Sequence, residues 1–481
     1  MELQVLFSGV PYTGTLPQGE ALLVTQDSRR ACPGAVFVCA RGMTTDGHDH
    51  ARKALEAGAV CIVTERPLGL PGEVQVASGR KAYAQLCQNF FGRPAEKLRL
   101  VAVTGTNGKT TVTTLIKQTL EQAGCKAGLI GTIHTEIDAM DVPAKYTTPE
   151  PWDLNALFSR MVLAGCTFAV MEASSQALDQ LRLWGLTFEV GVFTNLTQDH
   201  LDYHKSMESY FQVKARLFLE LPRPDKAMAV NADDPWGRRL LELCPTALSF
   251  GLQKGALNKR HLWGELLSAG TEGCHMRMHL EGSKWELRSP LVGAFNASNL
   301  LAVQAVALEM GIEPDAFKSL ESFTGVSGRL ERVENPQGLN VFVDYAHTPD
   351  ALENVLQALR GAGFKRVVTV FGCGGNRDRT KRPLMGEAVA RWSDVAVLTS
   401  DNPRFEEPEA ILQDVLPGLK SAREVVVEVD RRAATIKALK MLGKDDALLI
   451  AGKGHEDYQI IQGVKHHYSD QEVVREFLHC D

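Results

Sequence analysis

At residues 101–111 the sequence reads VAVTGTNGKTT, an apolar run that leads into a glycine-framed turn and then into a helix-forming segment. Gly105 and Gly108 allow the backbone to bend and to bring its N–H groups against phosphate oxygens, and the following helix points the positive end of its dipole at them. Lys109 supplies a positive charge, and the Thr110 hydroxyl is suited to bind Mg²⁺. The spacing between the two glycines is shorter than in most phosphate loops. The predicted strand before the turn and the predicted helix after it nevertheless lie where phosphate binding needs them. The stretch therefore predicts a nucleoside triphosphate site.

Length and composition narrow the class of protein. The chain has 481 residues, of which 44% are hydrophobic and 23% are charged. This is enough for about three domains of ordinary size. A formal net charge of −6, without a stripe rich in Lys and Arg, argues against a nucleic-acid surface. The ten cysteines are scattered with no CxxC pair, so neither a zinc site nor a disulfide framework is indicated. We expect a protein of the reducing cytoplasm.

Targeting and membrane signals are not apparent in the sequence. The start, Met1-Glu2-Leu3-Gln4, lacks a basic region followed by a long apolar stretch, and no run approaches the ~18 apolar residues of a membrane span. We expect a protein that is neither exported nor embedded in a membrane, and that has neither a nucleic-acid nor a membrane partner.

Strand and helix patterns divide the chain into three parts. The first ~90 residues hold short apolar strands, such as Gly34–Val38, and a helix-like stretch from Ala51 to Ala57, as in a small α/β unit. From about Leu98 strands and helices alternate, and around Arg329 this pattern restarts. The alternation predicts largely parallel sheets covered by helices. The predicted strands are Leu98–Val103, Phe168–Met171, Val190–Phe193, Ala227–Val230, Asn340–Val343, Arg366–Phe371, Val395–Leu398 and Ala447–Ile450.

Polar side chains follow the predicted strands at the ends where open parallel sheets bind ligands. We therefore expect an active site between domains, built from those strand ends. The residues in question are Glu172, Asn195, Asp344, Arg377, Asp401, Asn402, Arg404, Lys453 and His455.

Two further segments carry candidate chemistry. Glu172, in Met-Glu-Ala-Ser-Ser, would bring a carboxylate that can hold a cation, although the segment on its own is equally typical of an exposed strand end. The second segment runs from Asp199 through His200 and Asp202 to His204, with four imidazole or carboxylate groups within six residues. This density favours at least one metal ligand or substrate contact.

Taken in order, these motifs resemble those of the ATP-dependent Mur ligases of peptidoglycan synthesis, and the resemblance covers essentially the whole chain. The motifs are Thr104–Thr111, Met171–Ser175, Asn195-Leu196, Asp199–His204, Gly293–Asn299, Gly328-Arg329 and Asp344–His347. The resemblance implies three α/β domains. They are a small N-terminal α/β domain at 1–94, a central P-loop ATPase domain with a mainly parallel sheet at 95–326, and a C-terminal Rossmann-like domain at 327–481.

Within the family, three segments resemble members that add meso-2,6-diaminopimelate to UDP-N-acetylmuramoyl-L-alanyl-D-glutamate. They are Gly374–Asp378, Asp401–Arg404 and Gly452–Glu456. The resemblance implies phosphorylation of the D-glutamate carboxylate by ATP, followed by attack of the diaminopimelate amine on the acyl phosphate. It implies ATP and Mg²⁺ as cofactors, and we expect a monomer.

The resemblance also implies roles for individual residues, which fall into four groups. ATP would be bound by Gly105, Thr106, Asn107, Gly108, Lys109, Thr110, Thr111, Asn296, Arg329 and Asp344. The uridine nucleotide substrate would be bound by Gln26, Ser28, Met43, Thr44, Thr45, Thr147, Thr148, Ser174, Gln180 and Arg182. The amino acid would be bound by Arg377, Asp401, Asn402, Pro403, Arg404, Gly452 and Glu456. The metal ligands would be Thr110, Glu172, His200 and a carbamylated Lys214, and the catalytic residues Lys109, Glu172, His200 and Lys214.

Two departures from the family pattern affect the expected substrate contacts. Gln176 stands where many relatives have histidine, and Tyr146 stands where some have asparagine. Three alternatives remain open: a ligase of the same family that adds L-lysine, a folylpolyglutamate synthase, and a P-loop switch that hydrolyses ATP only to change shape.

Overall fold

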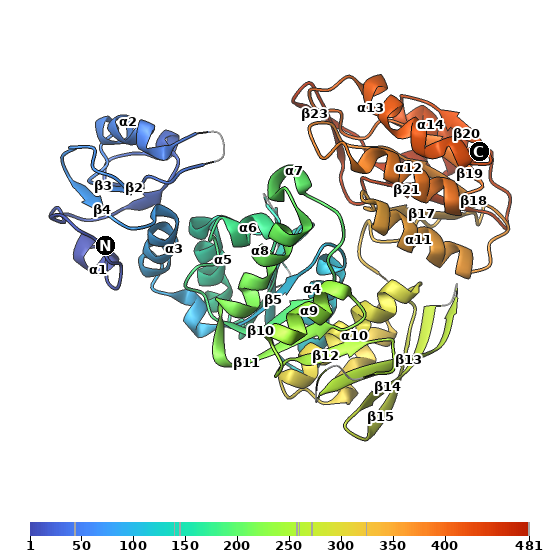
Figure 1. Ribbon diagram of the computed structural model, residues 1–481, viewed down its shortest axis with the longest axis horizontal. Coiled ribbons are helices and arrows are strands. Elements are labelled where there is room, and N and C mark those ends of the chain that lie inside the picture. The colour runs from blue at the N-terminus through green and yellow to red at the C-terminus, as the bar shows by residue number, and fades with distance from the viewer. Residues whose placement is uncertain are drawn as a thin grey trace. The chain divides into compact units, whose positions relative to one another are not determined.

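A computed structural model of residues 1–481 gives the fold (Figure 1). The structure describes residues 1–42, 45–138, 140–143, 146–255, 258, 260–270, 273–323 and 325–479. The chain forms two compact units. Unit 1 comprises residues 1–104, 123–192 and 213–227, and unit 2 comprises residues 105–122, 193–212 and 228–481.

Unit 1 begins with a small parallel sheet in the order β1-β2-β3-β4. Its strands are buried on both faces: Val36 and Val38 contribute to one core, Ala35 and Phe37 to the other. Helix α3 begins after Ser78, whose hydroxyl accepts a main-chain N–H of the first turn. The elements are α1 Leu3–Leu6, β1 Leu23–Thr25, η1 Ser28–Arg30, β2 Ala35–Val38, η2 Gly47–His50, α2 Ala51–Glu56, β3 Cys61–Thr64, β4 Glu73–Gln75, α3 Gly79–Phe90 and η3 Pro94–Lys97.

The remainder of unit 1 is built on β9, which lies between β5 and β6 and runs parallel to both. All five residues of β9 are buried, and Glu172 is its last residue. The Ser174 hydroxyl accepts the Ala177 N–H and caps α6, so the chain turns from the strand directly into a helix. The elements are β5 Arg99–Thr104, β6 Ala127–Ile130, β7 His134–Ile137, β8 Met140–Pro143, α5 Pro151–Leu163, β9 Phe168–Glu172 and α6 Ser175–Asp179.

Unit 2 contains the helix that follows the glycine-framed turn, α4, and the buried helix α10 packed beside it. Strands β12 and β13 are parallel, whereas β13, β14 and β15 form an antiparallel meander. Three elements, β10, α8 and β11, run from one unit into the other. The elements are α4 Lys109–Gln122, β10 Phe188–Phe193, α7 Leu201–His204, α8 Met207–Leu219, β11 Pro222–Asn231, α9 Pro235–Leu243, β12 Leu248–Gly251, β13 His261–Gly270, β14 Gly273–Leu280, β15 Ser283–Ser289, α10 Ala294–Glu309 and η4 Pro314–Glu321.

The last part of unit 2 is a six-stranded sheet in the order β16-β17-β21-β18-β19-β20, parallel except for β16. Helices α11, α12 and α13 cover one face, and α14 and α15 cover the other. Because β21 pairs between β17 and β18, the strand order changes direction there, which is where such sheets bind ligands. The elements are β16 Glu331–Arg332, β17 Asn340–Asp344, α11 Pro349–Gly361, β18 Val367–Phe371, α12 Lys381–Trp392, β19 Val395–Leu398, α13 Pro408–Val415, η5 Leu416–Ser421, β20 Val425–Val427, α14 Arg431–Lys440, β21 Ala447–Ala451, β22 Tyr458–Ile461, β23 Val464–His467 and α15 Asp470–His479.

The predicted α/β class and the largely parallel sheets are confirmed, but the β13–β15 meander was not predicted. Along part of β13 and β14 buried residues alternate with partly buried ones, and the strands pair with each other antiparallel, unlike the continuous apolar runs that signal parallel strands. Within the described ranges, none of the helices combines the length and hydrophobicity that crossing a membrane requires.

Candidate active site

The glycine-framed turn before α4 is contacted by polar groups of residues 194 and 195, which also belong to unit 2. A Cβ atom on Gly105 would lie 1.9 Å from the Thr194 hydroxyl oxygen, so only glycine fits there. The Asn107 N–H donates to Asn195 Oδ1 at 2.9 Å. The Lys109 ammonium donates to the carbonyl oxygens of Gly105 at 3.0 Å and Thr106 at 2.8 Å. The turn is therefore a rigid cradle of main-chain groups with a lysine at its mouth.

Arg329 contacts the start of α4, and Asp344 lies close enough to Arg329 to interact with its charge. Arg329 Nη2 donates to the Thr110 hydroxyl at 3.0 Å, and its guanidinium lies 4.8 Å from the Tyr345 ring centroid. Asp344 accepts the N–H groups of Leu330 and Ala346, both at 2.6 Å. Burial raises the pKa of Asp344, and Arg329 acts in the opposite direction. Among the described side chains, Arg329 Nε is one of the buried atoms without a hydrogen-bond partner, which makes it available to an anion.

The predicted residue Asn296 is connected to the glycine-framed turn by Asn299, which the sequence did not assign to the site. Asn299 Nδ2 donates to Asn296 Oδ1 at 3.1 Å, and a Cβ on Gly108 would lie 2.5 Å from Asn299 Oδ1. Asn299 ends the quoted motif Gly293–Asn299, and its position one helical turn after Asn296 is the signal that would have found it. The structure thus brings the residues predicted for ATP together in unit 2.

A second polar cluster surrounds the end of β9 in unit 1. Glu172 is 1% exposed, and its carboxylate accepts the Thr132 N–H at 2.8 Å and the Thr132 hydroxyl at 2.9 Å. The hydroxyls of Thr132 and Thr147 are 3.0 Å apart. The Thr148 hydroxyl lies 2.8 Å from the Glu172 carbonyl oxygen and 3.2 Å from the Ser174 hydroxyl. Four predicted residues, Glu172, Thr147, Thr148 and Ser174, are therefore close together.

Arg182 joins this cluster. Its Nη1 donates to the Thr148 carbonyl oxygen, and its Nη2 donates to Gln180 Oε1, both at 2.8 Å. Its Nη2 also forms an ion pair with Glu150 at 2.8 Å. The Arg182 guanidinium lies 5.3 Å from the Tyr146 ring centroid, so Tyr146, one of the two departures, packs on the arginine that we expect to bind substrate.

The other residues predicted for the uridine nucleotide lie in the first ninety residues of unit 1. Gln26 follows β1, and its Nε2 is buried without a hydrogen-bond partner among the described side chains. Ser28 begins η1. The Thr45 carbonyl accepts the Gly42 N–H at 2.8 Å. Met43 and Thr44 lie outside the described residues.

The residues predicted as metal ligands are divided between the units. Thr110 and His200 belong to unit 2, and Glu172 and Lys214 belong to unit 1. Lys214 is 1% exposed, and its ammonium lies 3.5 Å from the Thr104 hydroxyl. Among the described residues, no three His, Cys, Asp or Glu side chains form a metal-binding group.

A cavity of about 140 Å³ lies at the carboxyl ends of the C-terminal strands. It is lined by six of the seven residues predicted for the amino acid, Pro403 being the exception. The guanidinium of Arg404 donates to the Gly375 carbonyl at 2.8 Å, and Asn402 Nδ2 donates to Glu456 Oε2 at 2.9 Å. Burial, and then repulsion from Arg377, lower the pKa of Arg404. The lining residues from the prediction are Arg377, Asp401, Asn402, Arg404, Gly452 and Glu456.

Among the other residues that line this cavity, three carry charge or a proton near its carboxylates, and the sequence did not assign them to it: Asp199, His347 and Lys381. The Lys381 ammonium lies 3.5 Å from Asp199 Oδ1, and His347 Nε2 lies 3.8 Å from Asp199 Oδ2. Burial alone would raise the pKa of Asp199, but Lys381, His200 and His347 outweigh it and hold that pKa well below its usual range. Burial and Lys381 lower the pKa of His347 to about 4, so His347 is neutral at pH 7. Asp199 and His347 belong to the motifs Asp199–His204 and Asp344–His347, whereas no motif in the sequence pointed to Lys381.

Buried Lys453 connects the carboxylates of the cavity. Its ammonium lies 3.3 Å from Glu456 Oε2 and 3.7 Å from Asp401 Oδ1. The cavity therefore contains two guanidinium groups and several carboxylates, an arrangement suited to an amino acid with both kinds of charge.

Three family models match the chain in order. The model of the Mur ligase family, catalytic domain, matches residues 22–89; that of the Mur ligase middle domain matches residues 103–307; and that of the Mur ligase, glutamate ligase domain, matches residues 328–454.

Curated relatives match over nearly their full lengths. The UDP-N-acetylmuramoyl-L-alanyl-D-glutamate--2,6-diaminopimelate ligase of Lawsonia intracellularis is 48% identical over 96% of both chains. The ligase of the same name from Aquifex aeolicus is 43% identical over 95% of this chain and 94% of its own. A solved structure with this name covers 100% of this chain and 99% of its own, at 31% identity and a TM-score of 0.70. By these matches, the chain belongs to the Mur ligase family.

Proposed function

We propose that the protein joins meso-2,6-diaminopimelate to the D-glutamate carboxylate of UDP-N-acetylmuramoyl-L-alanyl-D-glutamate, with ATP as the energy source, in peptidoglycan synthesis. The observation that carries the proposal is the match to relatives named for this reaction, at 48% and 43% identity. The charges of the C-terminal cavity support it, because diaminopimelate has two carboxylates and two ammonium groups. Arg377 and Arg404 would pair with carboxylates, and Glu456 with an ammonium group.

The chemistry needs an activated carboxylate, because an amide does not form directly from a carboxylate at neutral pH. The γ-phosphoryl group of ATP is transferred to a D-glutamate carboxylate oxygen, which gives an acyl phosphate and ADP. A neutral amine of diaminopimelate then attacks the acyl carbon. The tetrahedral intermediate collapses, and phosphate leaves as the amide forms.

The phosphate end of ATP would be bound by the cradle before α4. Lys109 and Arg329 would offset the charge that builds on the transferring phosphoryl group. Lys109 directly precedes Thr110 at the start of α4, and Arg329 donates to the Thr110 hydroxyl, which supports these roles. Asn296 and buried Asp344 would hold the adenine and ribose parts. Positioning the groups and excluding water would supply most of the rate enhancement.

Mg²⁺ would be held by Thr110, Glu172, His200 and a carbamylated Lys214. The donor set fits the ion, because a hydroxyl, a carboxylate and a carbamate are hard oxygen ligands. Carbamylation of buried Lys214 would exchange a cation for an anion and remove a charge that repels the metal. When bound, Mg²⁺ neutralises charge on the phosphoryl oxygens.

The nucleotide substrate would lie along unit 1. Gln26, Ser28, Met43, Thr44 and Thr45 would bind its uridine diphosphate end. The cluster of Thr147, Thr148, Ser174, Gln180 and Arg182 would bind its peptide end. We retain the domain ranges 1–94, 95–326 and 327–481, a monomeric state and a cytoplasmic location as part of the proposal.

A phosphate-release assay with UDP-N-acetylmuramoyl-L-alanyl-D-glutamate, ATP and a panel of amino acids tests the function. We expect release with meso-2,6-diaminopimelate and almost none with L-lysine. Release with L-lysine alone would instead assign the lysine-adding reaction. Release that needs a folate acceptor, or that occurs with ATP alone, would refute the proposal in favour of a folylpolyglutamate synthase or an ATP-hydrolysing switch.

A further inference from the structure

A second cavity lies on the C-terminal part of unit 2, between the end of α12 and η5. Its volume is about 650 Å³, within the range of small-molecule sites. It shares no lining residue with the cavity predicted for the amino acid. Nothing in the proposed reaction uses it.

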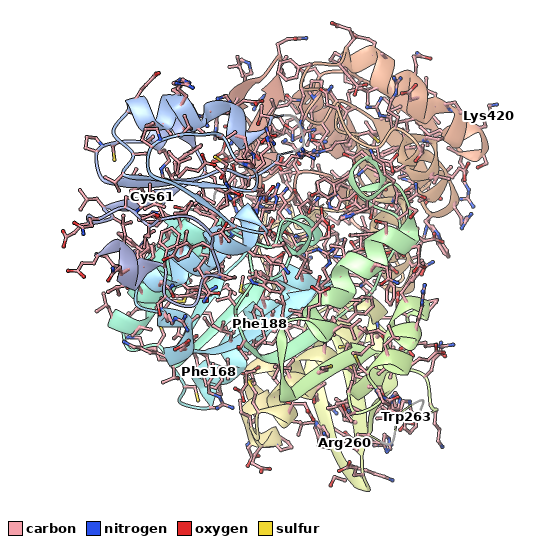
Figure 2. All side chains as sticks on the ribbon, turned by 60° about the vertical axis from the view of Figure 1, so that its left-hand side comes forward. Cys61, Phe168, Phe188, Arg260, Trp263 and Lys420 are labelled. Carbon is pink, nitrogen blue, oxygen red and sulfur yellow. The ribbon has the colours of Figure 1, made fainter. Side chains whose placement is uncertain are left out.

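Its lining is strongly cationic, although the whole chain has a net charge of −6. Arg360, Arg391, Lys420 and Arg423 line it, against the single carboxylate of Glu387. Figure 2 shows Lys420 at the outer edge of this part of the molecule, with its side chain directed into solvent. Among the described residues, Lys420 has no recorded ion-pair or hydrogen-bond partner for its ammonium. The cavity thus presents an excess of positive charge.

The carboxylate beneath the cavity balances only part of this charge. Asp394 is 12% exposed and pairs with Arg360 and Arg423, each at 2.7 Å. It also accepts the Val367 N–H at 2.9 Å. Arg360 Nε donates to the Trp392 carbonyl at 2.7 Å. One carboxylate therefore orients two guanidinium groups, and each has five N–H donors, more than these contacts use.

The cavity has a rigid floor. A Cβ on Gly418, in η5, would lie 1.9 Å from the Pro383 carbonyl oxygen, so η5 and α12 are in main-chain contact. Arg391 is 62% exposed and contacts Glu353 at 3.1 Å, a surface pair that is weak enough for a stronger anion to displace. The donors are thus partly pre-positioned around a fixed surface, which lowers the entropic cost of binding.

We propose that this cavity binds a phosphorylated small molecule, at a site separate from both substrates. Guanidinium groups recognise phosphate oxygens in a two-point fork, and a lysine adds a mobile point charge. The volume exceeds what a single phosphate group needs. A ligand with two phosphate groups, or one phosphate on a larger body, fits the charge and the size together.

The test is a calorimetric titration of the full chain with inorganic pyrophosphate. We expect two binding sites in the wild type, one at the cradle before α4 and one here. Lys420→Glu with Arg423→Glu removes the second site or weakens it ~10-fold or more. The matched control, Arg432→Glu with Lys444→Glu, changes two exposed cations of the same region outside the cavity and retains both sites.

Basal ligase activity without pyrophosphate should be the same in all three proteins, which shows that the variants fold. Equal stoichiometry and affinity in the wild type and the Lys420/Arg423 variant would overturn the proposal. A single wild-type site that the Lys420/Arg423 variant retains would also overturn it, whereas a single site that this variant loses would count against the cradle and not against this cavity. Sulfate and chloride are titrated at the same concentrations as pyrophosphate. If either anion binds this site as tightly as pyrophosphate does, the site attracts anions without specificity, and the proposal is refuted.

Discussion

The substitution Arg404→Lys tests whether the hydrogen-bonding geometry of the guanidinium group matters apart from its positive charge. The Arg404 main chain is fixed at φ 56°, and its N–H donates to the Ile460 carbonyl at 3.0 Å. Its Nη1 donates to the Gly375 carbonyl at 2.8 Å, which leaves Nε and Nη2 as donors for a substrate carboxylate. Lysine retains the positive charge but cannot make both the Gly375 contact and a two-point fork. The exchange therefore removes one or two charge-assisted hydrogen bonds.

Each such bond contributes about 1.5–3 kcal/mol in a site partly shielded from water. We expect kcat/KM for diaminopimelate to fall roughly 10²-fold in Arg404→Lys, since about 1.4 kcal/mol corresponds to a factor of ten. Arg404→Ala should lose at least as much and should also lower the preference for diaminopimelate over L-lysine. That preference comes from the second carboxylate, which L-lysine lacks.

The assay is coupled phosphate release at saturating ATP and nucleotide substrate, with each amino acid varied in turn. Arg432→Lys, an exposed arginine of the same region, is the matched control and should behave as the wild type. The KM for ATP should remain unchanged in all variants. Comparable use of L-lysine by the wild type, or an unchanged preference in Arg404→Ala, would refute the assignment of Arg404 as the specificity residue.

The other predictions concern the cradle, the modified lysine and the frame of the amino-acid cavity. Lys109→Ala should abolish turnover while the protein stays folded, because the lost charge acts on the nucleotide phosphates; near-normal ligation by a folded variant would rule out the cradle as the ATP site. Lys214→Ala should lose activity that short carboxylates partly restore, and intact mass of an active preparation showing unmodified Lys214, with no rescue, would contradict the carbamate. Arg382→Met should lower the free energy of unfolding by about 3 kcal/mol, because Glu406 and Asp414 lose the guanidinium group that they share, which is 1% exposed. Urea denaturation at pH 7 measures this free energy. A change below about 0.5 kcal/mol would contradict the structural role of Arg382. Hydrogen bonding from Arg382 lowers the pKa of Glu406 from its usual value of 4.5. The ion pair of the two residues therefore stabilises the fold above pH 4.5, and this stabilisation is lost as Glu406 becomes protonated on acidification. Between pH 7 and pH 3 the free energy of unfolding should accordingly fall less in Arg382→Met than in the wild type.

The sequence predicted those parts of the fold and site that depend on local pattern. The cradle at 105–108 was predictable because glycines, lysine and threonine follow an apolar strand without interruption. Glu172, Asp344 and Asp401 were predictable because each lies at or just after the carboxyl end of a buried strand. Asp344 and Asp401 lie at the same edge of the C-terminal sheet because the carboxyl ends of its parallel strands meet there, whatever separates them in the chain.

The parts that escaped prediction depend on contacts between distant segments. Lys381 begins a helix and reads as a solvated lysine, yet it is 6% exposed and close to Asp199, 182 residues earlier. The cation–π contact of Tyr146 with Arg182 requires knowing how the loop before α5 folds. The β13–β15 meander was missed because the surrounding pattern was typical of alternating strands and helices.

The close packing of Gly375 affects how the amino-acid cavity can change in evolution. A Cβ at Gly375 would lie 1.9 Å from the Pro403 carbonyl oxygen, and the Gly375 N–H donates to the Asn402 carbonyl at 2.9 Å. The two loops that carry Arg377 and Arg404 are thus joined by main-chain atoms, which most substitutions nearby leave in place. Side chains on this frame can be exchanged without rebuilding it, whereas even a methyl group at Gly375 would force the loops apart. A descendant enzyme could acquire a different amino-acid substrate through one or two side-chain changes, but glycine at this position would have to be inherited unchanged.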